Sequence, residues 1–237
     1  MAENSITAVL WDMDGVLIDS EPWYDITNGE MVRSLGFPYG EAEIAKVSGS
    51  SYKNIAETLA LDGVPKEKII RLYLASLTEA VRRVEGLVDG VTGFLTQLKN
   101  SGVKMAIGSS SPREVVDFAV NKFELYEWID VIVTGSDAEN GKPSPDIYIQ
   151  CAELLGVSPS ECLVFEDSRN GILAGKNAGM LTCAFTGTKR HDFDLSKADF
   201  ELASFSDALK IVEPYLKKQA IQAKNLAQSI ALCGSPI

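Results

Sequence analysis

The sequence predicts an α/β fold: a doubly wound parallel sheet, or Rossmann-like core, with an inserted α-helical domain. Short apolar runs that lead into acidic residues, hydroxyls or glycine are typical of buried strands that end in loops. After Gly90 such runs alternate with helical patterns of about 10 to 15 residues, which indicates βαβ units. Between Ser20 and Val88 the sequence has helical spacing and no strong strand pattern. We therefore expect one parallel sheet with helices on both faces, and a helical insertion after the first strand.

The first strand is expected at residues 6–11, directly before the insertion. Pro38 and the stretch 62–65 divide the insertion into several helices. Later, Gly102 marks the end of one helix and Pro112 the start of another. The later strands are expected at 103–108, 129–133, 162–165 and 181–185. The later helices are expected at 91–99, 112–122, 145–155 and 168–178, the last capped by Ser168.

These elements predict two domains and a tail. Residues 1–19 and 88–218 would form the Rossmann-like core, and residues 20–87 the helical insertion. Residues 219–237 are rich in Ala and Gln and have weak helical spacing. That tail fits either a docked helix or a loose end.

Charge and cysteine content narrow the class of protein. The 237 residues include 22 basic and 33 acidic ones, so the formal net charge is −11, which argues against partners such as nucleic acid or anionic membranes. The four cysteines form no Cys-x-x-Cys pair and His191 is the only histidine, so no zinc cluster is predicted. Three cysteines lie in apolar stretches and are expected to be buried. With no signal peptide and no long apolar run, we expect a soluble, cytoplasmic protein.

Polar residues follow four of the expected strands, at the carboxyl ends of the strands, where α/β proteins bind ligands. After the first strand, period-two alternation places Asp12 and Asp14 on the same side. Two carboxylates this close repel each other unless a cation lies between them or one holds a proton. Either arrangement suits a nucleophile and a general acid. A turn in which the acids cap the backbone explains the same residues.

Hydroxyls and a lysine follow the next two strands. Ser109, Ser110 and Ser111 precede a helix, which makes them either an anion site or an ordinary N-cap. Lys142 lies between a glycine and a proline, which restricts its placement. It would either neutralise a phosphate or be a solvated surface lysine.

Glu166 and Asp167 follow the strand at 162–165. Two acids directly after an apolar strand are costly to bury without a cation. Mg²⁺ prefers hard oxygen ligands and binds through one or two carboxylates together with water and phosphate. Helix capping would account for one of these acids more easily than for both. The four clusters together therefore predict a single site more strongly than any of them alone.

These residues resemble the motifs of the haloacid dehalogenase superfamily. The first motif is Asp12-Met13-Asp14-Gly15-Val16-Leu17-Ile18-Asp19-Ser20-Glu21-Pro22, and the others are Ser109, Lys142 and Glu166-Asp167. They occur in the family's order over about residues 6–216. The sequences Lys-Pro-x-Pro-Asp and Glu-Asp-Ser resemble the β-phosphoglucomutase-like phosphatase branch. That branch has a helical cap where this chain has its insertion.

The resemblance implies a phosphatase that acts on a small phosphorylated metabolite, such as a sugar or polyol phosphate. Asp12 would attack phosphorus and form an aspartyl-phosphate. Asp14 would protonate the leaving oxygen and then activate water. The implied cofactor is Mg²⁺, held by Asp12, the Asp14 main-chain carbonyl and Asp167, with Glu166 as a direct or indirect partner.

The resemblance also assigns the groups that bind phosphate. Ser109, together with Gly15 and Ser110, would hold the phosphoryl oxygens, and Lys142 would stabilise the charge on the nucleophile and on the phosphoryl group. This assignment agrees with the general needs of phosphoryl transfer, which are positioning and charge neutralisation.

Other members of the superfamily supply the alternatives. Haloacid dehalogenases lack the residue that matches Asp14, so phosphoryl transfer is favoured. The mutases carry a cap histidine and a cap arginine, whose matching positions here are Tyr24 and Tyr52, so we expect hydrolysis over β-phosphoglucomutase-type transfer. A degenerate, non-catalytic binding module is the second alternative, although no motif residue is missing.

Substrate selection is expected from the cap. The candidates for substrate contact are Trp23, Tyr24, Tyr52 and Lys53. Packing within the cap explains the three aromatic residues equally well. Arg82 and Arg83 are weaker candidates that also fit a solvated helix face. We expect the cap to close as a rigid body on linkers at 19–22 and 85–90, in a monomer or weak homodimer.

Overall fold

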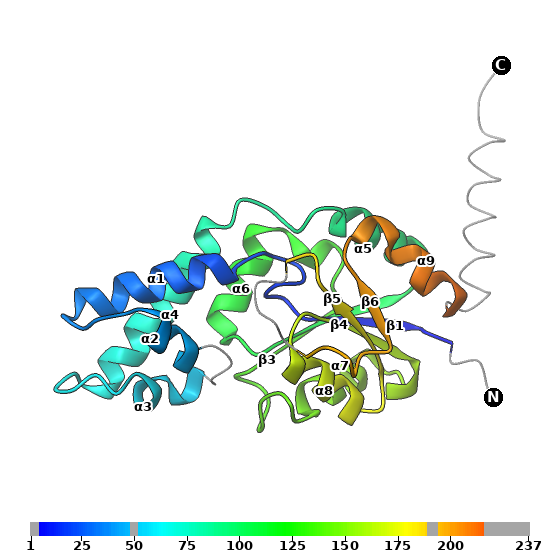
Figure 1. The fold of residues 1–237 in the computed structure, drawn as a ribbon. Coiled ribbons are helices and arrows are strands. Elements are labelled where there is room, and N and C mark those ends of the chain that lie inside the picture. The colour runs from blue at the N-terminus through cyan, green and yellow to red at the C-terminus, as the bar shows by residue number, and fades with distance from the viewer. Residues whose placement is uncertain (1–4, 48–51, 189–193, 216–237) are drawn as a thin grey trace, which may run out of the picture.

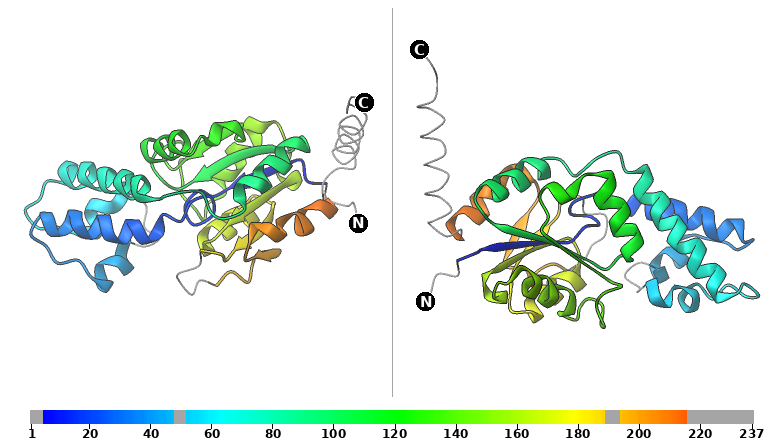
Figure 2. Two further views of the ribbon diagram at one scale, coloured as in Figure 1. Left: turned by 90° about the horizontal axis from the view of Figure 1, so that it is seen from above. Right: turned by 180° about the vertical axis from the view of Figure 1, so that it is seen from behind.

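The structure of the chain, a computed structural model, describes residues 5–47, 52–188 and 194–215. Its centre is a parallel sheet with helices on both faces, and helices α1 to α4 lie together at one end of the molecule (Figures 1 and 2). The predicted α/β fold class is confirmed. His191, Cys233 and the expected tail at 219–237 lie outside the described residues.

The sheet has six strands in the order β3-β2-β1-β4-β5-β6, and each neighbouring pair is parallel. The strands are β1 (Ala8–Trp11), β2 (Lys104–Ser109), β3 (Val131–Thr134), β4 (Cys162–Glu166), β5 (Leu181–Phe185) and β6 (Phe200–Leu202). The chain winds outward from β1 in one direction through β2 and β3, and in the other through β4, β5 and β6. The carboxyl ends of β1 and β4 therefore flank the point where the winding reverses, which is where ligands bind in such sheets.

The helices of the described residues either cover the two faces of this sheet (α5 to α9) or lie at one end of the molecule (α1 to α4). They are α1 (Glu21–Ser34), α2 (Glu41–Val47), α3 (Ile55–Leu59), α4 (Lys66–Arg83), α5 (Val91–Asn100), α6 (Arg113–Lys122), α7 (Asp146–Leu155), α8 (Arg169–Asn177) and α9 (Ala208–Val212). Val9 and Trp11 of β1 share one apolar cluster with α5, α6 and α9. Ala8 and Leu10 share the other with α7 and α8. Because successive side chains of a strand point to opposite faces, β1 is buried on both sides.

An aromatic cluster fixes β1 against β4. The fully buried Trp11 ring stacks on Phe165 of β4, with ring centroids 4.8 Å apart. Phe94 of α5 meets both rings edge-on. Such pairs add stabilisation beyond their buried area. They lie one residue before Asp12 on β1 and one before Glu166 on β4, so they set the relative position of these two strand ends.

Helices α1 and α4 form the main contact within the helical end of the molecule. The side of α4 that carries Ile69, Tyr73 and Leu77 is buried, which is the i, i+4, i+8 spacing of an amphipathic helix. Asn28 of α1 accepts a hydrogen bond of 2.7 Å from the buried Ser76 hydroxyl of α4. We call α1 to α4 the cap helices. That residues 20–87 form a separate domain stays a prediction.

The two chain segments that join the cap helices to the core pair with each other. Ile18 and Leu87 form an antiparallel bridge, and the Val88 N–H donates to the Leu17 carbonyl at 2.9 Å. The entry to the cap helices and the exit from them are therefore fixed side by side.

Lys122 binds the end of α4 to the core. From the last residue of α6, its ammonium group donates to the main-chain carbonyls of Val81, Arg82 and Val84. A cation at this end also complements the helix dipole. Burial, and then the charge of Arg82, lowers the pKa of Lys122.

Several sequence-based boundaries differ from the structure. β1 begins at Ala8, and the strand expected at 129–133 is Val131–Thr134. Pro112 precedes α6, which starts at Arg113. β6 and α9 were not predicted, because three to five residues are too few to show a period of 2 or 3.6.

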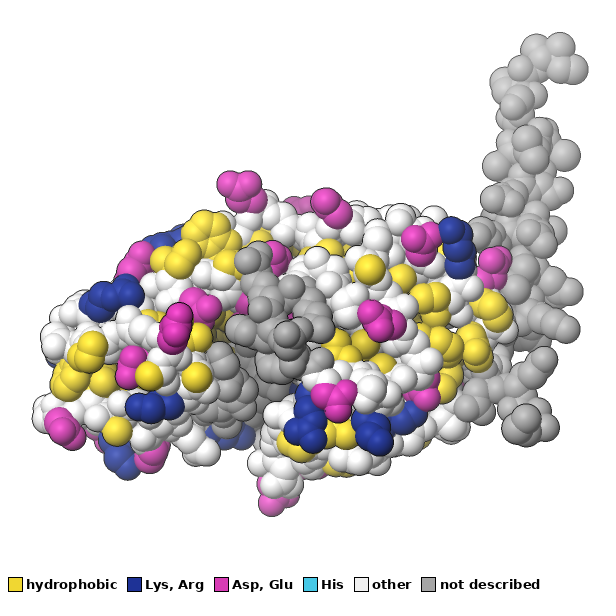
Figure 3. Space-filling model, viewed as in Figure 1, with side chains coloured by type: hydrophobic (Ala, Val, Ile, Leu, Met, Phe, Trp, Pro, Cys, Tyr) yellow, Lys and Arg dark blue, Asp and Glu magenta, His cyan; other side chains and the backbone are white. Residues whose placement is uncertain are grey.

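The surface and the cysteines agree with the expected character of the chain. Cys151, Cys162 and Cys183 are free and buried, and burial raises the pKa of each thiol to about 12. On the face shown in Figure 3, the described acidic and basic side chains are interspersed over the cap helices and the core. None of the helices in the described ranges has the length and apolar character needed to cross a membrane.

Asp199 links strand β5 to helix α8. Its carboxylate accepts the Thr182 N–H at 2.8 Å and the Lys176 ammonium at 2.7 Å. Burial opposes the charge, but the bonds from Lys176 and Thr182 outweigh it and lower the pKa of Asp199. A lowered pKa in the folded state means that the carboxylate stabilises the fold at neutral pH. That contribution is lost as the pH falls through the folded-state pKa.

We predict that Asp199→Asn lowers the melting temperature at pH 7 by about 2–4 °C, which corresponds to roughly 1 kcal/mol. The difference from the wild type should shrink toward pH 3, because the wild-type carboxyl is then protonated. Calorimetry from pH 7 to pH 3 measures this, with the exposed Asp62→Asn as the control. A difference that stays constant over that range would show that the charge of Asp199 contributes nothing.

Candidate active site

A cleft of about 890 Å³ lies between the cap helices and the carboxyl ends of the strands. The loop after β1, the loop after β2 and the start of α8 line it from the core, and α1 and α4 line it from the cap side. The sequence-predicted residues that line this cleft are Asp12, Asp14, Ser110, Lys142 and Asp167 from the core, and Tyr24, Tyr52 and Lys53 from the cap side. The predicted convergence at one edge of the sheet is therefore present.

Lys142 joins the ends of β1 and β4. Its ammonium nitrogen lies 2.5 Å from Asp12 Oδ1 and 2.6 Å from Glu166 Oε1, and the three side chains are at most 10% exposed. Burial disfavours the ammonium charge, but the Asp12 and Glu166 carboxylates outweigh it and raise the pKa of Lys142. Lys142 is thus a fixed buried cation beside Asp12.

Glu166 is engaged on both of its carboxylate oxygens. Oε1 accepts from Lys142 and from the Tyr148 hydroxyl at 2.8 Å, and Oε2 accepts from the Ser168 hydroxyl at 2.9 Å and the Ser168 N–H at 3.2 Å. A Cβ on Gly171 would lie 1.7 Å from Glu166 Oε1, so only glycine leaves room for this carboxylate. With four donors already present, Glu166 is better suited to hold Lys142 than to bind a metal directly.

Asp167 occupies a space that Gly15 provides. Gly15 has φ +80°, and a Cβ there would lie 1.9 Å from Asp167 Oδ2. The first-motif loop and the Asp167 carboxylate can therefore approach only because residue 15 is glycine. The Thr188 hydroxyl donates to the Gly15 carbonyl, a contact that the sequence analysis did not predict.

The acidic groups around Lys142 fit a divalent cation. Carboxylate oxygens of Asp12, Glu166 and Asp167 lie within 4.8 Å of one another. Burial raises the pKa of Asp12 although Lys142 lies beside it. Burial and the neighbouring Glu166 charge raise the pKa of Asp167. Three carboxylates thus share one ammonium, and a metal ion with hard oxygen ligands would relieve this excess of negative charge.

Three hydroxyls hold the Asp14 carboxylate. Oδ1 accepts from Ser20 at 2.6 Å and from Tyr24 at 2.7 Å, and Oδ2 accepts from Ser111 at 2.8 Å. Burial, and then the Asp14 charge, raises the pKa of Tyr24 well above its ordinary value, so this phenol stays a donor. Ser20 precedes α1, Tyr24 belongs to α1 and Ser111 follows β2. Both the cap side and the core therefore contact Asp14.

Ser109 shapes the loop after β2. Its side chain is fully buried, and its Oγ accepts the Ser111 N–H at 3.1 Å. Ser110 and Ser111 line the cleft. Sequence reasoning placed Ser111 in this cluster but did not assign it to Asp14, because that pairing depends on how the loops after β1 and β2 meet.

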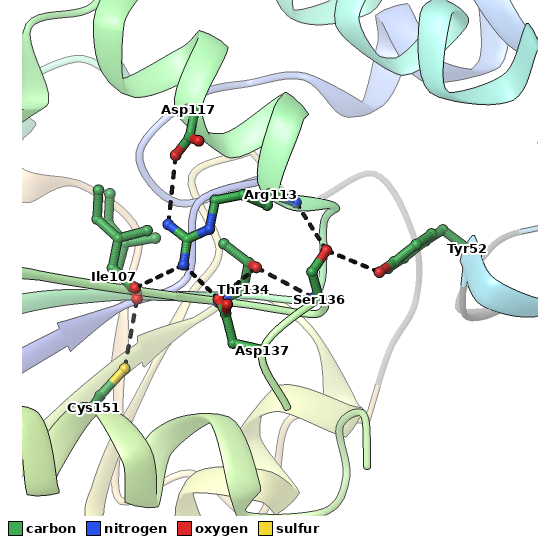
Figure 4. Close-up of polar contacts among 9 residues, drawn as sticks. Tyr52, Ile107, Arg113, Asp117, Thr134, Ser136, Asp137 and Cys151 are labelled. Atoms are coloured by element: carbon green, nitrogen blue, oxygen red, sulfur yellow. Dashed lines mark hydrogen bonds and ion pairs between the residues drawn. The ribbon is translucent and has the colours of Figure 1, made fainter. Parts of the chain in front are cut away.

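The remaining candidates on the cap helices differ in position. Trp23 packs against the apolar cluster and does not line the cleft. Tyr52 and Lys53 line the cleft but also contact the core loop after β3, as Figure 4 shows for Tyr52. Arg83 pairs with Glu79 and with Glu30 on the surface, as expected for a solvated helix face.

Known proteins share this architecture. A family model described as haloacid dehalogenase-like hydrolase matches residues 9–185, so the chain belongs to that family. Hexitol phosphatase B of Escherichia coli K12 is 27% identical over 210 residues, which cover 86% of this chain and 95% of that protein. The phosphorylated carbohydrates phosphatase of Thermotoga maritima is 33% identical over 177 residues, which cover 73% and 82%. The crystal structure of CbbY from Rhodobacter sphaeroides in complex with phosphate has a TM-score of 0.75 at 26% identity and covers 85% of this chain and 96% of that one.

The family resemblance drawn from the motifs is thereby confirmed. Membership in this hydrolase family and several curated relatives named as phosphatases make the chain a phosphatase. The individual roles of its site residues remain proposals and are argued below.

We predict that Gly15→Ala lowers phosphatase activity by at least about a hundredfold, because the added Cβ displaces Asp167 and strains a positive-φ residue. Gly63→Ala is the matched control, since Gly63 has φ +77° and no atom of the described residues lies within 4 Å of an added Cβ. Both variants should lose about 1 kcal/mol of stability from backbone strain, and only Gly15→Ala should lose activity. Equal activity in the two variants would refute the role of the Gly15 space.

Proposed function

We propose that the chain hydrolyses small phosphate monoesters of sugars or polyols with Mg²⁺, through an aspartyl-phosphate on Asp12. The observation that carries this proposal is the group of Asp12, Lys142 and Asp167 at the reversal point of the sheet, with Asp14 two residues from Asp12. It combines a nucleophile, a fixed cation, a metal ligand and a proton carrier. A non-catalytic binding module would have no need for all four.

In the first step an Asp12 carboxylate oxygen attacks phosphorus while the bond from phosphorus to the ester oxygen breaks. Asp14, in its protonated form, gives its proton to that leaving oxygen. Lys142 lies against Asp12 and neutralises negative charge on the nucleophile and on the phosphoryl group. The alcohol then leaves.

In the second step Asp14, now a carboxylate, takes a proton from water while the water oxygen attacks phosphorus. The bond between phosphorus and the Asp12 oxygen breaks, which releases inorganic phosphate and regenerates both acids. Because Asp14 serves first as acid and then as base, its carboxyl must keep one orientation through both steps. The hydroxyls of Ser20, Tyr24 and Ser111 supply that orientation.

The ligands that suit Mg²⁺ are Asp12, Asp167 and the main-chain carbonyl of Asp14. Glu166 would act indirectly, because its oxygens already accept from Lys142, Tyr148 and Ser168. A bound Mg²⁺ would neutralise phosphoryl oxygens in the transition state. Phosphoryl oxygens would also meet the loop of Ser110 and the loop of Gly15, whereas Ser109 would act by fixing the first of these loops.

The substrate class follows from the cleft and from the relatives. Tyr24, Asn28 and Tyr73 line the cap side of the cleft with hydroxyl and amide groups, which suit hydrogen bonds to a polyhydroxylated group. The relatives are named for hexitol phosphates and phosphorylated carbohydrates. A sugar or polyol monophosphate agrees with both observations.

We predict that Asp12→Asn lowers the hydrolysis of p-nitrophenyl phosphate by at least about a thousandfold while the melting transition persists. EDTA should abolish wild-type activity and added Mg²⁺ should restore it. The surface variant Asp207→Asn is the control. Substantial Mg²⁺-dependent turnover by folded Asp12→Asn would exclude an aspartyl-phosphate on this residue.

We predict that a panel of hexose, hexitol and nucleoside monophosphates yields inorganic phosphate, with the sugar and polyol esters turned over fastest. With β-glucose 1-phosphate the product should be free phosphate, because the residues that match the mutase histidine and arginine are Tyr24 and Tyr52. Phosphate release is measured colorimetrically and glucose 6-phosphate by a coupled assay. Accumulation of glucose 6-phosphate would support the mutase alternative instead.

A further inference from the structure

Two neighbouring residues of the cap side reach across to one loop of the core. They belong to the short 3₁₀ turn Tyr52–Asn54. The Tyr52 hydroxyl lies 3.0 Å from the Ser136 hydroxyl, and the Lys53 ammonium donates to the Ala138 carbonyl at 3.2 Å. Figure 4 shows Tyr52 pointing from the cap side toward Ser136 at the end of β3. We call residues 134–138 the docking loop.

The docking loop is held rigidly from within the core. Asp137 Oδ2 accepts from the Thr134 N–H at 2.8 Å, from the Thr134 hydroxyl at 2.7 Å and from the Arg113 guanidinium. The same guanidinium donates to the Ile132 carbonyl at 3.2 Å. The loop therefore keeps its shape without help from the cap helices.

The Ser136 hydroxyl is positioned by two of these residues. Its oxygen accepts the main-chain N–H of Arg113 at 3.1 Å, and the Ser136 N–H donates to the Thr134 hydroxyl at 3.2 Å. One lone pair and the hydroxyl hydrogen of Ser136 remain for Tyr52, which can complete the pair as donor or as acceptor. Ser136 thus presents a preformed partner for a hydroxyl from the cap side.

The docking loop also touches the loop that contacts Asp14. The Gly135 N–H donates to the Ser111 carbonyl at 3.2 Å, and a Cβ on Gly135 would lie 2.3 Å from the Ser110 carbonyl and 3.3 Å from the Tyr52 ring. Gly135 is therefore packed between Tyr52 and the loop of Ser110 and Ser111. Ser111 in turn donates to Asp14.

We propose that Tyr52 is a positioning residue, which docks the cap helices on Ser136 and so places Tyr24 of α1 against Asp14, which Ser111 contacts from the core. Tyr52 then stabilises the closed cleft and does not contact the substrate. The expected kinetic effect rests on the proposed hydrolysis. The docking contact itself does not depend on that function. It assigns Tyr52 and Lys53 to closure, where the sequence had suggested substrate contact.

The kinetic test is a double-mutant cycle with Tyr52→Phe and Ser136→Ala, which each remove one hydroxyl. Each should lower kcat/KM by about five- to tenfold, the effect of one hydrogen bond, and the double variant should lose no more than either alone. The loss should be the same for p-nitrophenyl phosphate and for the best polyol phosphate. Tyr126→Phe, at an exposed tyrosine of the core, is the control.

A role for Tyr52 in substrate contact gives a different pattern. In that case Ser136→Ala would leave kcat/KM unchanged, and the effect of Tyr52→Phe would differ between the two substrates. Either result would overturn the proposal.

A distance measurement separates this proposal from the proposed function. Spin labels at Asp62→Cys, before α4, and Glu153→Cys, on α7, report on the separation of cap side and core in a Cys233→Ser background. Both labelled sites are exposed, whereas the three described cysteines are buried. Tyr52→Phe and Ser136→Ala should each shift the distance distribution toward longer values, with or without Mg²⁺ and inorganic phosphate. An unchanged distribution would refute the docking role even if the enzyme is an active phosphatase, and a shift would support it even if no substrate is turned over.

Discussion

The buried ammonium of Lys142, placed between Asp12 and Glu166, connects the two strand ends on which the site is built. Taking three charges out of water is costly, and removing one partner of such a group costs about 3–5 kcal/mol. The arrangement has further support: Tyr148 and Ser168 donate to Glu166, while the stacked Trp11 and Phe165 fix the strands that lead into the acids. The packing of the sheet therefore also fixes the positions of the charged groups in the cleft.

Space is as important as charge in this site. Gly15 admits the Asp167 carboxylate and Gly171 admits Glu166, in both cases at distances that a single methyl group would forbid. Gly135 does the same for the loop of Ser110. For Gly15 and Gly135 the residue type is set by a neighbour distant in the sequence, and for Gly171 by Glu166 at the end of the preceding strand, so backbone flexibility alone does not explain these glycines.

Much of this site could be predicted from the sequence, because the ends of apolar strands can be recognised there. Asp12, Lys142 and Asp167 each follow an apolar run, and parallel strands bring such positions together. The division of labour between Glu166 and Asp167 was not predictable, because it depends on donors from α7 and α8. The direction of Tyr52 was equally hidden, since it depends on a core loop 84 residues away.

Lys122 restrains the C-terminal end of helix α4. Because it binds the last carbonyls of α4, we expect that end to move least if the cap helices rotate against the core. An 18-residue helix is about 27 Å long, so a rotation of about 10° displaces its far end by about 5 Å. A small rotation about that end would thus be enough to widen the cleft, which Tyr73 and Leu77 of α4 line. Lys122 itself does not line the cleft.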